Sequence, residues 1–202
     1  MTKMRCLMTA ACCAVLTLPV MSMAQDMASA KPMPKMAVEG TPLTPAASLN
    51  AALSVFEEEV VGAAEAMPAE KYDFAPSVPG GEFKGVRTFG EQVKHLAGSS
   101  SEFFHGFGVT GGVDPKMLDN LKTKDELVKA LKDSFAYAHT AISSITPENA
   151  FLALKGPENF KSTRVSMASF YMAHSMDHYG QMVEYLRMNG IVPPASRPGA
   201  SM

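Results

Sequence analysis

Two histidines stand four residues apart near the C-terminus, in the run His174-Ser-Met-Asp-His178. The surrounding sequence is typical of a helix, in which residues four apart differ by about 40° around the axis and lie one turn apart. Both imidazoles therefore point into the same space, as two ligands of one divalent metal must. A third histidine, His95, lies in another predicted helix and would complete three nitrogen ligands. Three protein ligands leave one coordination position open, which is typical of a catalytic metal site.

The same histidines have a plainer interpretation. His174 and His178 fall on one line of their helix with apolar residues such as Met188, so we expect them inside the helix assembly or at its mouth. Buried imidazoles need hydrogen-bond partners whether or not they bind a metal. His95 lies at the border of the apolar stripe of its own helix, where a solvated histidine is also common. The two alternatives, metal ligands and hydrogen-bonded structural histidines, stay open at this point.

Neighbouring polar residues could support chemistry at such a site. Glu91, one turn before His95, could orient an imidazole or act as a general base. Gln181, three residues after His178, could hydrogen-bond a metal-bound species. We expect Tyr185 to serve packing and Arg187 to interact with the dipole at the end of its helix.

The other two histidines give no second site. His105 is predicted to lie on the surface, and His139 borders an apolar stripe without a companion, so we interpret it as structural. Inward-facing carboxylates are scarce, which argues against a ferroxidase or electron-transfer site.

Four amphipathic segments are predicted to be helices, and together they indicate an all-α fold, a four-helix bundle. Thr44-Pro45 opens the first, and Thr88 with Glu91 and Thr123 with Glu126 form capping boxes that open the second and third. The predicted helices cover about 45–67, 88–107, 123–145 and, starting between 162 and 166, the residues up to 189.

The N-terminal 24 residues resemble a secretory signal peptide. A basic start is followed by an apolar stretch and by small residues before Gln25. The apolar stretch is shorter than the ~20 residues that span a bilayer, so we expect cleavage and a periplasmic or secreted protein without membrane insertion. Domain boundaries follow: signal peptide 1–24, disordered linker 25–44, helical domain 45–194 and disordered tail 195–202.

Composition narrows the choice of ligands and partners. All three cysteines lie within the first 24 residues, so the cleaved chain would bind a metal through His, Asp, Glu or water. Charge is nearly balanced, with 18 Lys and Arg against 20 Asp and Glu, and nothing indicates a nucleic-acid partner.

Two runs resemble the DinB/YfiT-like superfamily. One is Arg87-Thr-Phe-Gly-Glu-Gln-Val-Lys-His95-Leu-Ala, and the other is His174-Ser-Met-Asp-His178-Tyr-Gly-Gln181-Met-Val-Glu-Tyr185-Leu-Arg187-Met-Asn-Gly190-Ile-Val-Pro193-Pro194. The resemblance covers about residues 46–194. It implies an up-down-down-up bundle, often dimeric, that binds Zn²⁺ or Ni²⁺ through three histidines, at positions matched here by His95, His174 and His178. Relatives include thiol-dependent transferases and isomerases.

The sequence therefore predicts an exported, divalent-metal-binding protein with Zn or Ni held by His95, His174 and His178. It would be a metal-dependent hydrolase or transferase with an unidentified small-molecule substrate. Export away from cytosolic thiols weakens the thiol-transferase expectation. The alternative is a non-catalytic metal-binding or interaction bundle.

Overall fold

The computed structural model describes residues 38–155 and 162–200. The predicted signal peptide and most of the predicted linker lie outside these residues. Within them the chain is helical and forms no strand, and a single isolated bridge pairs Ala153 with Thr163. None of the described helices is both long and apolar enough to cross a bilayer.

Each of the four long helices begins after a threonine whose side-chain oxygen accepts a backbone N–H of the first turn. The helices are α1 (Pro45–Ala66), α2 (Phe89–Phe104), α4 (Lys124–Ser143) and α5 (Arg164–Met188). Their capping threonines are Thr44, Thr88, Thr123 and Thr163. The three caps expected from the sequence are confirmed, and so are the two predicted capping boxes.

A fifth helix, α3 (Pro115–Leu118), was not predicted. It is a single turn that Asp114 caps and that starts with a proline, so it is too short to produce a helical repeat of apolar residues. The last turn of the predicted second helix is also different, since residues His105–Phe107 form a 3₁₀ turn after α2 ends.

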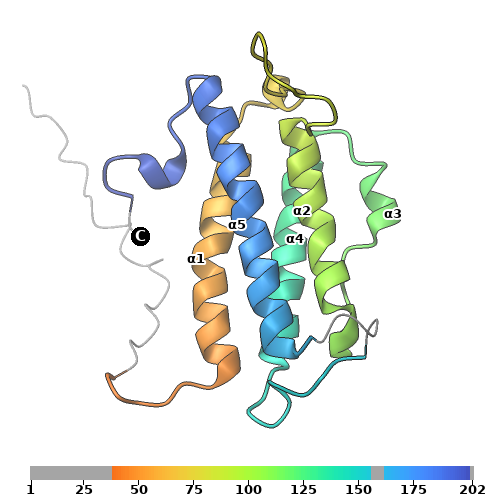
Figure 1. Ribbon diagram of the computed structural model, residues 1–202, viewed down its shortest axis with the longest axis vertical. Coiled ribbons are helices and arrows are strands. Elements are labelled where there is room, and N and C mark those ends of the chain that lie inside the picture. Colours follow the sequence, from red (N-terminus) through yellow and green to blue (C-terminus); the bar gives the residue numbers. More distant parts are fainter. Residues whose placement is uncertain (1–37, 156–161, 201–202) are drawn as a thin grey trace, which may run out of the picture. The chain divides into compact units, whose positions relative to one another are not determined.

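The four long helices pack in a closed ring of neighbours. Helix α2 contacts α4 and α5, and α1 contacts the same two helices from the other side. In Figure 1, α1 and α5 run upward and α2 and α4 run downward. The two helices that carry the candidate ligands, α2 and α5, are therefore antiparallel neighbours.

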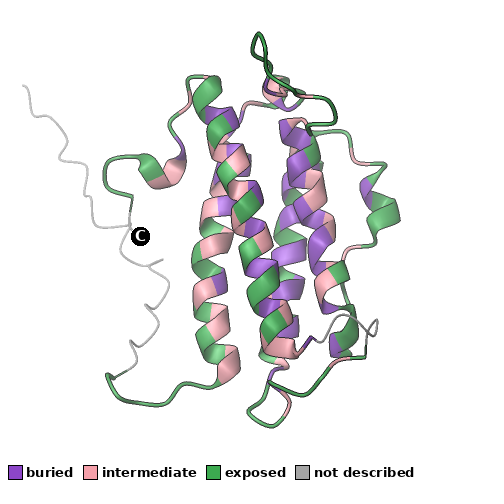
Figure 2. Cartoon of the chain, in the orientation of Figure 1, coloured by how far each residue is buried: buried purple, intermediate pink, exposed green. Residues whose placement is uncertain are grey.

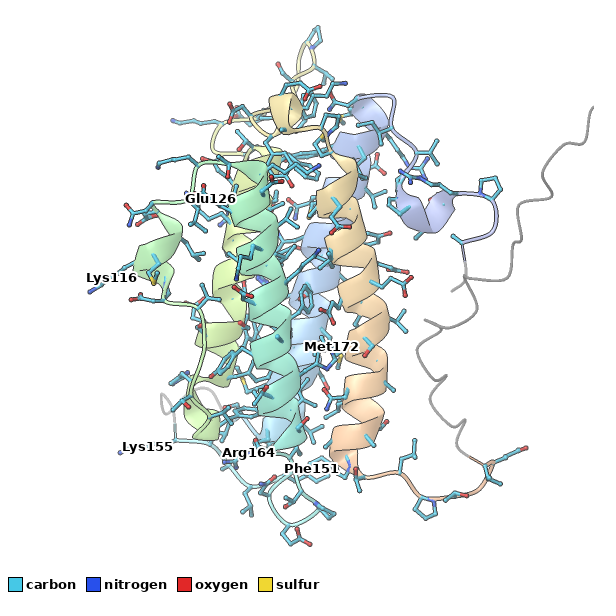
Figure 3. All side chains as sticks on the ribbon, turned by 180° about the vertical axis from the view of Figure 1, so that it is seen from behind. Lys116, Glu126, Phe151, Lys155, Arg164 and Met172 are labelled. Carbon is cyan, nitrogen blue, oxygen red and sulfur yellow. The ribbon has the colours of Figure 1, made fainter. Side chains whose placement is uncertain are left out.

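Apolar side chains between these helices form one core, shown by the buried faces in Figure 2. Apolar residues at helical spacing along α4 and just after it are all buried: Leu127, Leu131, Phe135, Ala138, Ile142 and Ile145. On α5, Met172 lies between α5 and α1 (Figure 3). The candidate ligands thus stand on helices that a continuous core holds in place.

The inward face of α5 is offset from the predicted line. Met188, which the sequence places on that line, is 53% exposed, while Tyr171 and Leu186 are fully buried. The reason is that α5 packs against both α1 and α2, which moves the centre of its buried face toward the core. His174 consequently lies at the edge of that face, half-buried, and His178 is buried.

Ordered structure continues past residue 194, where the sequence predicts a disordered tail. Residues Pro194–Ser196 form a 3₁₀ turn that contacts α1. Arg187 donates from Nη2 to Ser196 Oγ at 3.1 Å, and Arg197 donates from Nε to the Val192 carbonyl at 3.2 Å. These two hydrogen bonds hold the segment against the last turn of α5 and the loop that follows it.

Candidate metal centre

Three imidazoles from two helices meet between α2 and α5. His95 lies in the second turn of α2, and His174 and His178 lie in the middle of α5. One ring nitrogen from each lies within 4.8 Å of the others. The Nε2 atoms of His95 and His174 are 3.1 Å apart, and the three ring centroids are separated by 4.5 to 5.1 Å. The structure thus brings together the three predicted ligands.

The donor set fits a divalent transition metal. At a metal–nitrogen distance of ~2.0–2.1 Å, two histidine nitrogens on one ion lie about 2.9–3.4 Å apart. The 3.1 Å between Nε2 of His95 and Nε2 of His174 falls within this range. Imidazole nitrogen is a common ligand of Zn, Ni, Cu and Fe, whereas Mg and Ca prefer oxygen. The residues present therefore suit a divalent transition metal.

Contacts at the start of α2 fix its position against α5. Tyr185 of α5 donates its hydroxyl to the Arg87 carbonyl at 3.0 Å, just before α2 begins. The Gly90 N–H donates to the Tyr72 carbonyl at 2.8 Å. His95 lies five residues after Gly90, so these two bonds hold the start of the helix that carries it. Tyr185 is buried against Phe74, so its predicted packing role is confirmed.

Gln92 fixes the ring of His178. It lies on α2, three residues before His95, and its side chain is buried. Its Oε1 is 2.7 Å from Nδ1 of His178. An amide oxygen only accepts hydrogen bonds, so Nδ1 carries the proton and the Nε2 lone pair of the neutral ring is available for a metal. Such an acceptor behind a ligating histidine sets both the tautomer and the ring orientation.

The hydrogen bonds continue from Gln92 to a carboxylate. Gln92 donates from Nε2 to Oε1 of Gln181 at 2.7 Å, and Gln181 donates from Nε2 to Oδ2 of Asp177 at 3.2 Å. The chain therefore runs from the His178 ring to the exposed Asp177 carboxylate. A negative charge at its end favours donation by every group before it, and so favours Nδ1–H on His178.

Ser99 lies beside the other two rings. Its hydroxyl donates to the His95 carbonyl at 2.8 Å, and its Oγ is 3.2 Å from Nε2 of His174. Among the described residues no hydrogen bond reaches Nδ1 of His95 or of His174. Of the three rings, only that of His178 has its second nitrogen fixed by a residue in the described part of the chain.

The surroundings keep all three rings neutral. Burial lowers the pKa of His178 to about 4, and the neighbouring His174 and His95 add to this shift. Burial is also the main reason why the pKa values of His95 and His174 are lowered, and the Arg87 charge contributes to both. Neutral imidazoles at pH 7 are the form that binds a metal, because the ligand needs a free lone pair.

Glu91 does not join the three rings in the structure. Its exposed carboxylate accepts the Thr88 N–H through Oε2 at 2.7 Å and so completes the capping box of α2. Its role as a general base stays a prediction. Gln181 does lie at the centre, but it contacts the ring of His178 through Gln92.

The two remaining histidines lie outside the centre. His105 is exposed, with Nδ1 bound to the Glu102 carbonyl at 2.9 Å, as expected for a surface residue. His139 joins α4 to α1, because its ring nitrogens contact Asn50 Oδ1 at 2.8 Å and Glu57 Oε2 at 3.0 Å. This agrees with a structural role.

Gln92 and Ser99 contact the three histidines, and the sequence did not reveal either contact. Both lie on the side of α2 that carries His95, at −3 and +4 from it. A sequence signal for them exists. Each is a polar residue at helical spacing from a candidate ligand, on a face that is expected to be buried.

The comparisons with known proteins agree with this description. The family model of the DinB superfamily matches residues 52–182, more than half of the 202-residue chain, and the match includes all three histidines. A search of curated proteins found no match. The chain belongs to the DinB superfamily.

Proposed function

We propose that this protein binds one divalent metal ion, Zn or Ni, through His95, His174 and His178. The protein would be a hydrolase or transferase that depends on this ion. The observation that carries the proposal is the convergence of three ring nitrogens within 4.8 Å, on two helices. Hydrogen-bonded structural histidines explain this cluster less well. A hydrogen bond between His95 and His174 would account for the 3.1 Å between their Nε2 atoms, but it does not account for the third imidazole, whose centroid lies 4.5 to 4.6 Å from those of the other two.

A bound metal of this kind lowers the pKa of a coordinated water or thiol and so supplies a nucleophile near neutral pH. The protein's own residues would orient the ligands. Gln92 holds the proton on Nδ1 of His178, and Gln181 holds Gln92 in the required amide orientation. The amide of Gln181 has two N–H groups, and Asp177 accepts one of them, so the other remains for a hydrogen bond to the bound substrate.

The proposal also covers architecture and location. The four long helices would form an up-down-down-up four-helix bundle, consistent with their packing and directions (Figure 1). The sequence of residues 1–24 supports export to the periplasm or the medium, and N-terminal sequencing of the exported protein should begin near Gln25. A homodimer stays part of the proposal, to be tested by light scattering.

Elemental analysis of untagged protein tests the metal site. Wild type should contain about one Zn or Ni per chain, and His95→Ala and His174→Ala should lose it. His105→Ala is the matched control, because this exposed histidine lies outside the cluster. Circular dichroism should show that the variants remain helical. Unchanged metal content in both site variants would disprove the assignment.

The alternative function is a non-catalytic metal-binding or interaction protein. One observation favours it: the nearest predicted base, Glu91, uses its carboxylate to cap α2. The two functions separate in an activity screen of the metal-loaded protein with ester, amide and thiol-acceptor substrates. Turnover that disappears in His174→Ala supports the enzyme, and a complete lack of turnover with full metal content supports the binding protein.

A further inference from the structure

An apolar hollow adjoins the three-histidine cluster on one side. It lies on the surface where α2 and α5 meet, has a volume of about 220 Å³, and is lined by Glu102, Phe103, Met167 and Phe170. Phe103 is two turns after His95 on α2, and Phe170 is one turn before His174 on α5. The same two helices therefore form both the cluster and the hollow.

Phe103 connects the two features directly. Its ring centroid is 5.2 Å from that of His174, with a tilt of 37° between the planes. The Phe170 ring also meets the Phe103 ring edge-on, with the centroids 5.2 Å apart and 80° between the planes. A group that occupies the hollow would thus touch the ring that in turn touches a proposed metal ligand.

The opposite side of the cluster is less suited to an apolar group than the hollow is. There Gln92, Gln181 and Asp177 form the hydrogen-bonded chain behind His178. Covering these polar groups with an apolar substituent would remove them from water without replacing their hydrogen bonds. A ligand at the metal therefore has one favourable direction for an apolar part, toward Phe103.

The size and charge of the hollow limit which chemical groups can occupy it. Its volume is below the ~300–1,000 Å³ of pockets that hold whole drug-sized ligands, so it suits one substituent. Aromatic walls favour another ring, which can pack edge-to-face against Phe103 or Phe170. Glu102, exposed at the rim, would repel an anionic substituent.

We propose that this hollow binds an uncharged aromatic group of the ligand that coordinates the metal at His95, His174 and His178. The substrate class is then a molecule with a metal-binding donor and a nearby neutral ring. This inference rests on the proposed metal site and adds which ligands that site would prefer. Phe103 and Phe170 are its specificity-determining residues, and Glu102 excludes anionic rings.

Thiol probes test the inference on Co²⁺-loaded protein. Ethanethiol, phenylmethanethiol and the para-carboxy derivative of phenylmethanethiol share one donor and differ in the substituent. Their binding is followed by the sulfur-to-cobalt charge-transfer band, which requires no turnover. We expect phenylmethanethiol to bind at least 10-fold more tightly than ethanethiol, and the carboxy derivative to lose several-fold of this advantage at low salt.

Three variants test which residues produce the preference for an uncharged aromatic thiol. Phe170→Ala, at a half-exposed position, and Phe103→Leu, which keeps apolar volume, should each lower the preference for the aromatic thiol roughly 2- to 12-fold. Glu102→Gln should strengthen binding of the carboxy derivative several-fold more than binding of ethanethiol. Equal affinities for ethanethiol and phenylmethanethiol would overturn the inference, as would a preference that survives both phenylalanine variants.

The same experiment separates the two proposals. Failure to take up Co²⁺ would overturn the metal site and the inference together. Uptake of one Co²⁺ per chain with no aromatic preference would leave the proposed function standing and would overturn the inference alone.

Discussion

Nδ1 of His178 and Oε1 of Gln92 lie 2.7 Å apart, and this contact joins α5 to α2 inside the candidate metal centre. Among the residues that the structure describes, it is the one hydrogen bond that fixes the second ring nitrogen of a proposed ligand. It also connects that ligand to a carboxylate, Asp177, through two amides. The contact therefore links the geometry of the candidate metal centre to the packing of α2 against α5.

Removing the Gln92 amide should weaken metal binding without abolishing it. Gln92→Leu keeps the buried volume but leaves Nδ1–H of His178 without an acceptor, and loss of such a partner typically costs 10- to 100-fold in metal affinity. Competition titration with a chromophoric chelator measures the change. Gln92→Glu is the matched control, because its carboxylate still accepts from His178. Equal Zn affinity for wild type and Gln92→Leu would show that the contact does not support the site.

The cap formed by Glu91 gives a second prediction. Glu91→Ala should lower the free energy of unfolding by about 0.5–1 kcal/mol, since the Thr88 N–H loses its acceptor, while metal content stays unchanged. Glu126→Ala, at the same position of the α4 capping box, should cost at least as much, because its Oε2 accepts from the N–H groups of Lys122 and Thr123 and from the Thr123 hydroxyl. Urea denaturation compares the two. If Glu91→Ala lost its metal and Glu126→Ala did not, Glu91 would belong to the site.

The metal-free protein should become less stable as the pH falls from about 6.5 to about 4. The pKa of His178 is about 4 in the folded protein, because burial and the other two rings disfavour its charged form. The unfolded chain, with a histidine pKa of about 6.5, binds a proton in this window while the folded chain does not, so protonation favours unfolding. His95 and His174, whose pKa values are also lowered, add to the effect.

Urea denaturation of metal-free protein at pH 7.5 and pH 5 measures this dependence. His178→Gln should reduce it, and His105→Ala should leave it as in wild type. A free energy of unfolding that rises toward pH 5 would contradict the burial of these neutral rings.

Two glycines should respond in opposite directions to alanine. A Cβ at Gly90 would lie 3.2 Å from both the Tyr72 carbonyl oxygen and the Tyr72 ring. Neither can move easily, because the carbonyl accepts from Gly90 and the Tyr72 hydroxyl donates to the Ala64 carbonyl at 2.7 Å. We expect Gly90→Ala to destabilise the protein by about 1–3 kcal/mol, which exceeds the gain in helix propensity.

Gly180 is the matched control for Gly90. It lies within α5, and a Cβ there would have no neighbour within 4 Å. Gly180→Ala should therefore stabilise the protein by about 0.4–1 kcal/mol, through the smaller conformational entropy of the unfolded chain. Thermal denaturation of both variants is the measurement. A stable Gly90→Ala variant would mean that the start of α2 is less tightly held by Tyr72 than described.

Local signals in the sequence predicted most of the helices that position the site. A threonine with a glutamate three residues later marks the start of α2 and of α4, because each capping box satisfies backbone groups at the helix start. The spacing of His174 and His178 predicted that they share a face, which depends only on helix geometry. Helix α3 has too few residues to produce such a pattern.

Contacts between helices could not be predicted in the same way. Gln92 is 86 residues from His178, and nothing near a glutamine in the sequence indicates a partner at that distance. The offset of the buried face of α5 has a similar cause. It follows from the packing of α1 and α2 on two sides of the helix, and the periodicity of α5 alone does not contain it.

X-ray absorption at the metal edge tests the central claim most directly. We predict that the protein, purified with its own metal, shows three imidazole ligands and no sulfur ligand, and that His174→Ala loses the metal or keeps at most two imidazoles. Protein that purifies without metal and takes up none, or a bound metal with fewer than three imidazoles in wild type, would contradict the assignment of His95, His174 and His178.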